Sequence, residues 1–141
     1  MANEAVNNQA LESFTNLDKI AYKLLHIIFT IAPIIAGADK FFNFLTDWGT
    51  YLSPVIARAM PFNLSLFLRA AGVVEIIAGL LVAFIPKIGA FIVSAWLLLI
   101  IGNLLFMPGY FDIALRDLGL AVAAFSLGLM SIKHQCKCVK K

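Results

Sequence analysis

The chain contains four long stretches in which nearly every residue is apolar and charged residues are rare. A helix needs about 20 mainly apolar residues to cross a hydrocarbon core of ~30 Å. The stretches therefore predict four membrane-spanning helices, at about 18–42, 63–85, 88–106 and 112–132. They do not alternate apolar and polar residues with a period of two, so the pattern is not that of a membrane β-barrel.

The remaining segments divide the chain into one membrane domain and two tails. We predict a polar N-terminal tail at 1–16, a four-span domain at 17–133 and a basic C-terminal tail at 134–141. The first tail lacks the basic region and cleavage site of a secretory signal, so the first stretch is expected to be a retained span. The connection 43–62 is long and aromatic, and we expect its middle to form a short interfacial helix that anchors the protein or covers a site.

Composition supports the same class. Of the 141 residues, 62% are hydrophobic and 13% are charged, and the mean hydropathy is +0.92. Soluble domains are about 45–50% apolar and about 25% charged. The chain is therefore expected to be an all-α, integral membrane four-helix bundle in contact with the lipid bilayer. No basic stripe with interleaved aromatic residues is present, so we expect no nucleic acid as a partner.

The positions of lysine and arginine predict the orientation. Four spans place both termini on one side, together with Lys19, Lys23, Lys87, Lys133, Lys137, Lys140 and Lys141. The opposite side carries Lys40, Arg58, Arg69 and Arg116. Since cytoplasmic loops are rich in lysine and arginine, we predict cytoplasmic termini in a multi-pass protein of the bacterial inner membrane.

An acidic residue, Glu75, lies in the middle of the second stretch, where a charge is costly. Gly72, Glu75 and Gly79 follow i, i+3, i+7 spacing and share one helix face. Because small residues let a neighbouring backbone approach closely, Glu75 is predicted to point into a helix–helix contact.

Similar faces of small and polar residues occur in the other predicted spans. They consist of His26, Thr30, Pro33, Gly37 and Lys40 in the first, Gly89, Trp96 and Asn103 in the third, and Asp117, Ala121, Ala124 and Gly128 in the fourth. We predict a polar cluster between the helices, formed by Lys40, Arg69, Glu75, Asn103, Arg116 and Asp117. Its three cations and two anions leave one positive charge, which would suit an anionic or quinone-like ligand. Structural pairing, a ligand or redox site, and a proton or ion path remain open as interpretations.

Metal and haem chemistry have little support in the sequence. His26 stands alone among apolar residues, and a b-type haem held between spans normally needs two histidines, so we expect no haem. In the tail, His134, Cys136 and Cys138 are weak candidates for a soft metal. We favour a basic tail that binds anionic headgroups, with lipidation of a cysteine left open, and predict no metal site.

Catalytic motifs are absent from the sequence. There is no C-x-x-C, G-x-S-x-G or H-E-x-x-H, and no glycine-rich phosphate loop. We therefore predict no catalytic residue, so any enzymatic role would be that of a non-catalytic subunit.

Three segments together resemble the DoxX-like family of small four-span membrane proteins. They are "IAPIIAGADKFFNFLTDWGTYLSP", "GVVEIIAGLL" and "LRDLGLAVAAFSLGL", and the similarity extends over about 17–133. In that family a glycine and a lysine end the first span, a glutamate lies in the second, and an Arg-Asp pair enters the fourth in some branches. The matching residues here are Gly37, Lys40, Glu75, Arg116 and Asp117.

The resemblance implies a redox-linked role. The family takes its name from a membrane subunit linked to thiosulfate:quinone oxidoreduction, and other members resemble accessory partners of redox proteins. This chain is accordingly expected to be an accessory or scaffold subunit, with quinone as the candidate cofactor and other membrane subunits or a second copy as partners. The alternatives are a purely structural subunit of a larger membrane complex and a small transporter or channel.

Overall fold

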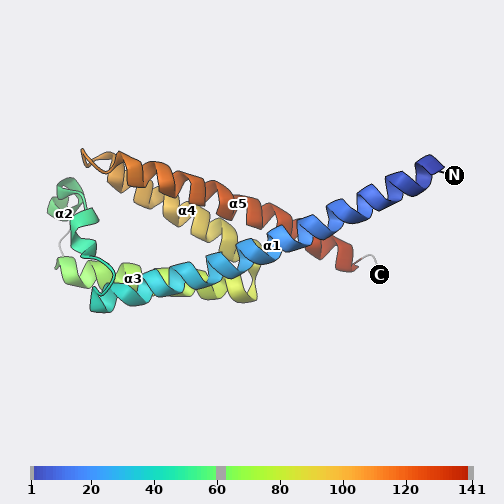
Figure 1. Ribbon diagram of the computed structural model, residues 1–141. Helices are drawn as coiled ribbons and strands as arrows, with labels where there is room; N and C mark the ends of the chain where they lie inside the picture. The colour runs from blue at the N-terminus through green and yellow to red at the C-terminus, as the bar shows by residue number, and fades with distance from the viewer. Residues whose placement is uncertain (1, 60–62, 140–141) are drawn as a thin grey trace.

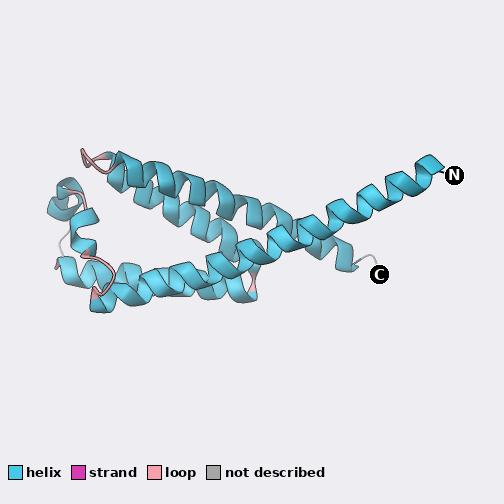
Figure 2. Ribbon diagram, viewed as in Figure 1, coloured by secondary structure: helices cyan, strands magenta, loops and turns pink. Residues whose placement is uncertain are grey.

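The protein is almost entirely helical (Figure 2). The computed structural model describes residues 2–59 and 63–139, with side chains at 14, 16–58 and 63–133. This part of the chain contains no strand. Its elements are α1 (Ala2–Phe42), the 3-10 helix η1 (Trp48–Tyr51), α2 (Pro54–Ala59), α3 (Leu64–Phe84), α4 (Pro86–Leu105) and α5 (Phe111–Val139).

The predicted all-α, four-span architecture is confirmed. By length and composition, the helical segments able to cross a membrane are Asn16–Phe42, Leu64–Phe84, Pro86–Leu105 and Phe111–Lys133. Each agrees with a predicted span to within a few residues at either end. The expected short helix in the long connection is also present, as α2 after η1. The length and composition of these four helices are thus those of a multi-pass membrane protein.

Both tails continue the adjoining helices. α1 begins at Ala2 and α5 ends at Val139, so the two helices extend into the predicted polar N-terminal tail at 1–16 and the predicted basic C-terminal tail at 134–141. Neither tail contains proline or glycine, so nothing in these sequences stops a helix that the packed span has already nucleated. The two ends of the chain lie at the same end of the bundle, as an even number of spans requires (Figure 1).

The helices form two pairs. α1 packs along α3, α4 packs along α5, and the pairs are joined chiefly through α3 and α4. Figure 1 shows the pairs lying apart at the end that holds η1 and α2, which we call the loop end. The opposite end, which holds both termini, is the terminal end. The shared core consists of Phe29, Ala78, Val82, Ala90, Val93, Ala124 and Leu127.

Glycines bring the backbones of α1 and α3 into contact. A Cβ atom on Gly37 would lie 2.5 Å from the carbonyl oxygen of Gly72, and one on Gly72 would lie 2.6 Å from that of Gly37. A Cβ atom on Gly79 would likewise lie 2.8 Å from the carbonyl oxygen of Thr30. The predicted close-packing face of the second span is therefore confirmed, and it faces α1.

The small residues of α5 serve the same purpose against α4. Ala121 and Ala124 are buried, and the Ser94 hydroxyl of α4 donates to the carbonyl of Ala121 at 2.9 Å. Gly128 makes room for the ring of Phe91, whose atoms would lie 2.8 Å from a Cβ atom at that position. Large apolar side chains such as Leu24, which is 63% exposed, cover the outer surface and suit contact with lipid.

His26 completes the hydrogen bonding at the turn between α3 and α4. The carbonyl of Val82 would normally accept from the N–H of residue 86, but Pro86 has no N–H. His26 Nε2 donates to this carbonyl at 2.8 Å, and its ring stacks on Tyr22 with centroids 5.8 Å apart. His26 is thus a packing and hydrogen-bonding residue, as its isolated position indicated.

Candidate functional site

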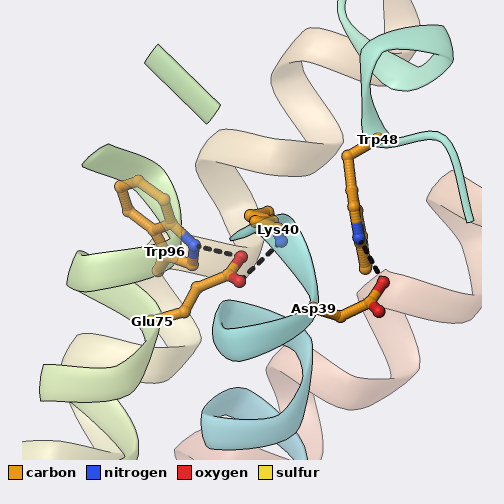
Figure 3. Close-up of polar contacts among 5 residues, drawn as sticks. All are labelled: Asp39, Lys40, Trp48, Glu75 and Trp96. Atoms are coloured by element: carbon orange, nitrogen blue, oxygen red, sulfur yellow. Dashed lines mark hydrogen bonds and ion pairs between the residues drawn. The ribbon is translucent and has the colours of Figure 1, made fainter. Parts of the chain in front are cut away.

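The centre of the candidate site is an ion pair between α1 and α3. Lys40 Nζ donates to Glu75 Oε2 at 2.6 Å, and the two side chains are only 7% and 8% exposed (Figure 3). Gly72 allows this short distance because it has no side chain. A Cβ atom on Gly72 would lie only 3.2 Å from the Cβ of Lys40. The sequence placed both residues in the site, and the structure pairs them.

Trp96 of α4 provides a second hydrogen bond to the same carboxylate. Its indole Nε1 donates to Glu75 Oε1 at 3.1 Å, so each oxygen of Glu75 accepts one hydrogen bond (Figure 3). Trp96 belongs to the predicted inward face of the third span, although it was not selected there as a site residue. The Glu75 carboxylate therefore connects three helices, and losing either donor would leave a buried acceptor unsatisfied.

Trp48 covers the Lys40 ammonium from the connection after α1. Lys40 Nζ lies 3.6 Å from the centroid of the Trp48 ring, a cation–π contact. Trp48 Nε1 in turn donates to Asp39 Oδ2 at 2.7 Å (Figure 3). We expected this connection either to anchor the protein or to cover a site. The contact between Trp48 and Lys40 is the kind that a covering segment makes.

Asp39 holds the start of the connection in place, and the sequence analysis missed it. Its Oδ1 accepts the backbone N–H groups of Phe44 and Leu45, both at 2.9 Å. The chain turns back here because Asn43 adopts a left-handed conformation, with φ of 51°. A carboxylate in the last turn of a helix opposes the helix dipole, and that placement was the signal that Asp39 has partners beyond the helix.

Asn103 binds the connection rather than the ion pair. Its Nδ2 donates to the carbonyl of Tyr51 at 2.6 Å, and its Oδ1 accepts from the N–H of Ser53 at 2.9 Å. Ser53 is fully buried, and its hydroxyl accepts the N–H of Val55 at the start of α2. Asn103 therefore fastens η1 and α2 to the loop end of α4.

Arg116 and Asp117 pair with each other. Arg116 Nη2 lies 3.0 Å from Asp117 Oδ1, and their side chains are 67% and 8% exposed. Within the described part of the chain, no hydrogen bond or ion pair joins them to Lys40 or Glu75. The remaining predicted member, Arg69, is exposed and has no ion-pair partner among residues 14, 16–58 and 63–133.

Among the described side chains, the predicted members are the Lys40–Glu75 pair, the Arg116–Asp117 pair, Asn103 bound to the connection, and Arg69 without an ion-pair partner. Of these six residues, only Lys40 and Glu75 are joined across helices in the part of the chain that the structure describes. Among the described side chains the Lys40 ammonium forms an ion pair with one carboxylate, that of Glu75, and Asp39 joins the group through the indole of Trp48.

Metal ligands do not gather in the described side chains. No group of three histidine, cysteine, aspartate or glutamate residues among them could hold a metal ion. The tail candidates His134, Cys136 and Cys138 lie outside the residues whose side chains are described.

Comparison with protein-family models, curated proteins and solved structures finds no match to this chain. The class rests on the fold and the site alone. This is a four-helix, multi-pass membrane protein with a buried lysine–glutamate pair between two tryptophans.

Proposed function

We propose that this protein is a DoxX-like accessory or scaffold subunit of a redox-linked, quinone-associated system in the bacterial inner membrane. In this proposal its termini are cytoplasmic, and the group of Lys40, Glu75, Trp96 and Trp48 engages a small ligand or a partner subunit. Support for the family comes from Gly37, Lys40 and Glu75, which match its motif and meet at one helix contact.

The observation that carries the proposal is the burial of the Lys40–Glu75 pair inside predicted spans. Ionisable side chains at such positions are costly, and they usually serve a functional site. The surrounding groups also suit a quinone-like head. Indole rings offer flat apolar faces, and an ammonium and an indole N–H can donate to carbonyl oxygens.

A purely structural subunit is the second candidate, and one observation favours it. Both oxygens of Glu75 already have donors, and Lys40 already has Glu75 and Trp48. A closed group of this kind could serve only to hold α1, α3 and α4 in register.

Glu75→Gln distinguishes the two candidates, since it keeps the shape of the side chain and removes the charge. The full chain is purified in mild detergent, and co-purified subunits, extracted quinone and the melting temperature are measured. If the group is a ligand or partner site, the Glu75→Gln variant should remain folded but yield less extracted quinone or fewer co-purified subunits than the wild type.

Asp117→Asn is the matched control, because it also neutralises a buried carboxylate but lies in a separate pair. This variant should yield the same amounts of extracted quinone and co-purified subunits as the wild type. If Glu75→Gln lowers only the melting temperature, with recovery equal to that of the control and the wild type, the structural role is correct.

A further inference from the structure

An open cleft of about 220 Å³ lies at the loop end, where Lys40 of the ion pair forms part of its lining. It is formed by the end of α1, the turn around η1 and the first two turns of α3, segments that lie together in Figure 1. The polar side chains in its lining are Lys40, Asn43, Asp47, Ser65 and Arg69. Lys40 is occupied by Glu75 and Trp48, which leaves Arg69 as the cation available to a ligand.

The position of Arg69 inside a candidate membrane span favours an anionic partner for its guanidinium. It lies inside the candidate span Leu64–Phe84, five residues after its start, or about 8 Å along the helix axis. Its side chain is exposed and has no ion-pair partner in the part of the chain that the structure describes. A guanidinium at this depth reaches the headgroup layer, and phosphate is its best-matched bidentate acceptor there.

The first turn of α3 adds further donors on the same side of the cleft. Asn63 is the N-cap residue of α3 but makes no side-chain hydrogen bond to that turn. The N–H groups of Leu64 and Ser65, residues that both line the cleft, therefore receive no hydrogen bond from the Asn63 side chain. Uncapped N–H groups at a helix start favour a phosphate oxygen, which reinforces Arg69.

The carboxylate in the lining indicates what else the ligand carries. Asp47 accepts the N–H of Gly49 through Oδ1, and its side chain is otherwise exposed to the cleft region. A simple anion would be repelled by Asp47, whereas an ammonium group would be attracted by it. Phe41 and Leu68, also in the lining, are apolar and suit the glycerol and upper acyl region of a lipid.

We infer that this cleft binds the headgroup of an aminophospholipid, with the phosphate on Arg69 and the ammonium on Asp47. The proposed lipid contacts do not rest on the redox role, because Arg69 and Asp47 are not members of the proposed ligand group, although Lys40 of that group also lines the cleft. A phospholipid is the favoured source of the phosphate because the cleft opens at the end of a membrane span.

The test measures binding of defined lipids to the delipidated full chain in detergent by native mass spectrometry. The probes are dioctanoyl phosphatidylethanolamine, dioctanoyl phosphatidylglycerol and inorganic phosphate. The wild type should bind both lipids and prefer phosphatidylethanolamine. Arg69→Gln should weaken both lipids by at least about tenfold, the scale of one charge-assisted hydrogen bond. Asp47→Asn should remove the preference while retaining phosphatidylglycerol.

Arg58→Gln is the matched control, since it removes an exposed arginine of α2 that does not line the cleft. It should bind as the wild type does, and Arg69→Lys should fall between wild type and Arg69→Gln. Equal binding by Arg69→Gln and Arg58→Gln would overturn the site. Displacement of the lipid by equimolar inorganic phosphate would show a free-phosphate site instead, and equal binding of the two lipids by wild type would overturn the assignment of Asp47.

Discussion

Lys40 Nζ lies 2.6 Å from Glu75 Oε2, and the same ammonium lies 3.6 Å from the centre of the Trp48 ring. Lys40 therefore links α3 to the connection that follows α1. A buried ion pair is strongly destabilised when one partner is removed, because the other charge remains in a low-dielectric environment. This property allows the pair to be tested directly.

Lys40→Met should lower the free energy of unfolding by about 3–5 kcal/mol, since it leaves Glu75 buried without its cation. The double variant Lys40→Met/Glu75→Leu should recover much of this loss, because a buried pair can often be replaced by apolar residues at little cost. Denaturant unfolding in detergent measures both. A single variant as stable as the wild type would contradict the pairing.

Gly72→Ala should separate α1 from α3. Its new methyl group would lie 2.6 Å from the carbonyl oxygen of Gly37, so the helices must move apart at a cost of about 1–3 kcal/mol. Gly119→Ala is the matched control, with no atom within 4 Å of the added carbon. Thermal unfolding should show a lower melting temperature for the first variant and an equal or higher one for the second. Equal melting temperatures would disprove the close contact.

Asp39→Ala should loosen the connection after α1. The N–H groups of Phe44 and Leu45 would lose their acceptor, and Trp48 would lose its own. Hydrogen exchange in residues 44–48 should become faster by about tenfold or more, as expected for the loss of local protection. Asp112→Ala, at the start of α5, should leave exchange in this segment unchanged. Unaltered exchange in Asp39→Ala would mean that other contacts hold the connection.

His26→Phe should destabilise the turn between α3 and α4. The aromatic ring is kept, but the carbonyl of Val82 loses the donor that compensates for Pro86. An unsatisfied buried acceptor costs about 1–3 kcal/mol. Ser126→Ala removes a hydrogen bond within one helix at an exposed site and should have little effect. Similar stabilities for the two variants would show that the Val82 carbonyl finds another partner.

The proposed orientation is tested at Thr50, which is exposed in the connection between α1 and α2. In a chain with Cys136→Ser and Cys138→Ser, a Thr50→Cys variant should react with a membrane-impermeant maleimide added to intact cells. Reaction only in inverted membrane vesicles would place the termini outside the cytoplasm. Lys133→Cys in the same background is the control and should show the reverse pattern.

Much of the fold follows from short-range patterns in the sequence. Apolar runs of sufficient length predict the four spans, and the spacing of Gly72, Glu75 and Gly79 predicts which face of the second span is packed. His26 was likewise interpreted correctly from its apolar surroundings. These features depend on residues within a few turns of one another, so periodicity alone reveals them.

Pairing between helices depends on how the helices cross, and periodicity does not contain that information. The sequence grouped Lys40, Arg69, Glu75, Asn103, Arg116 and Asp117. In the part of the chain that the structure describes, only Lys40 and Glu75 of this group meet across helices. Asp39 was overlooked because its partners, Trp48 and two backbone N–H groups, are reached only after the chain reverses at Asn43. Tertiary structure thus selects the partners of each charge, since a hydrogen bond requires its atoms within about 3 Å and periodicity places side chains only on a face.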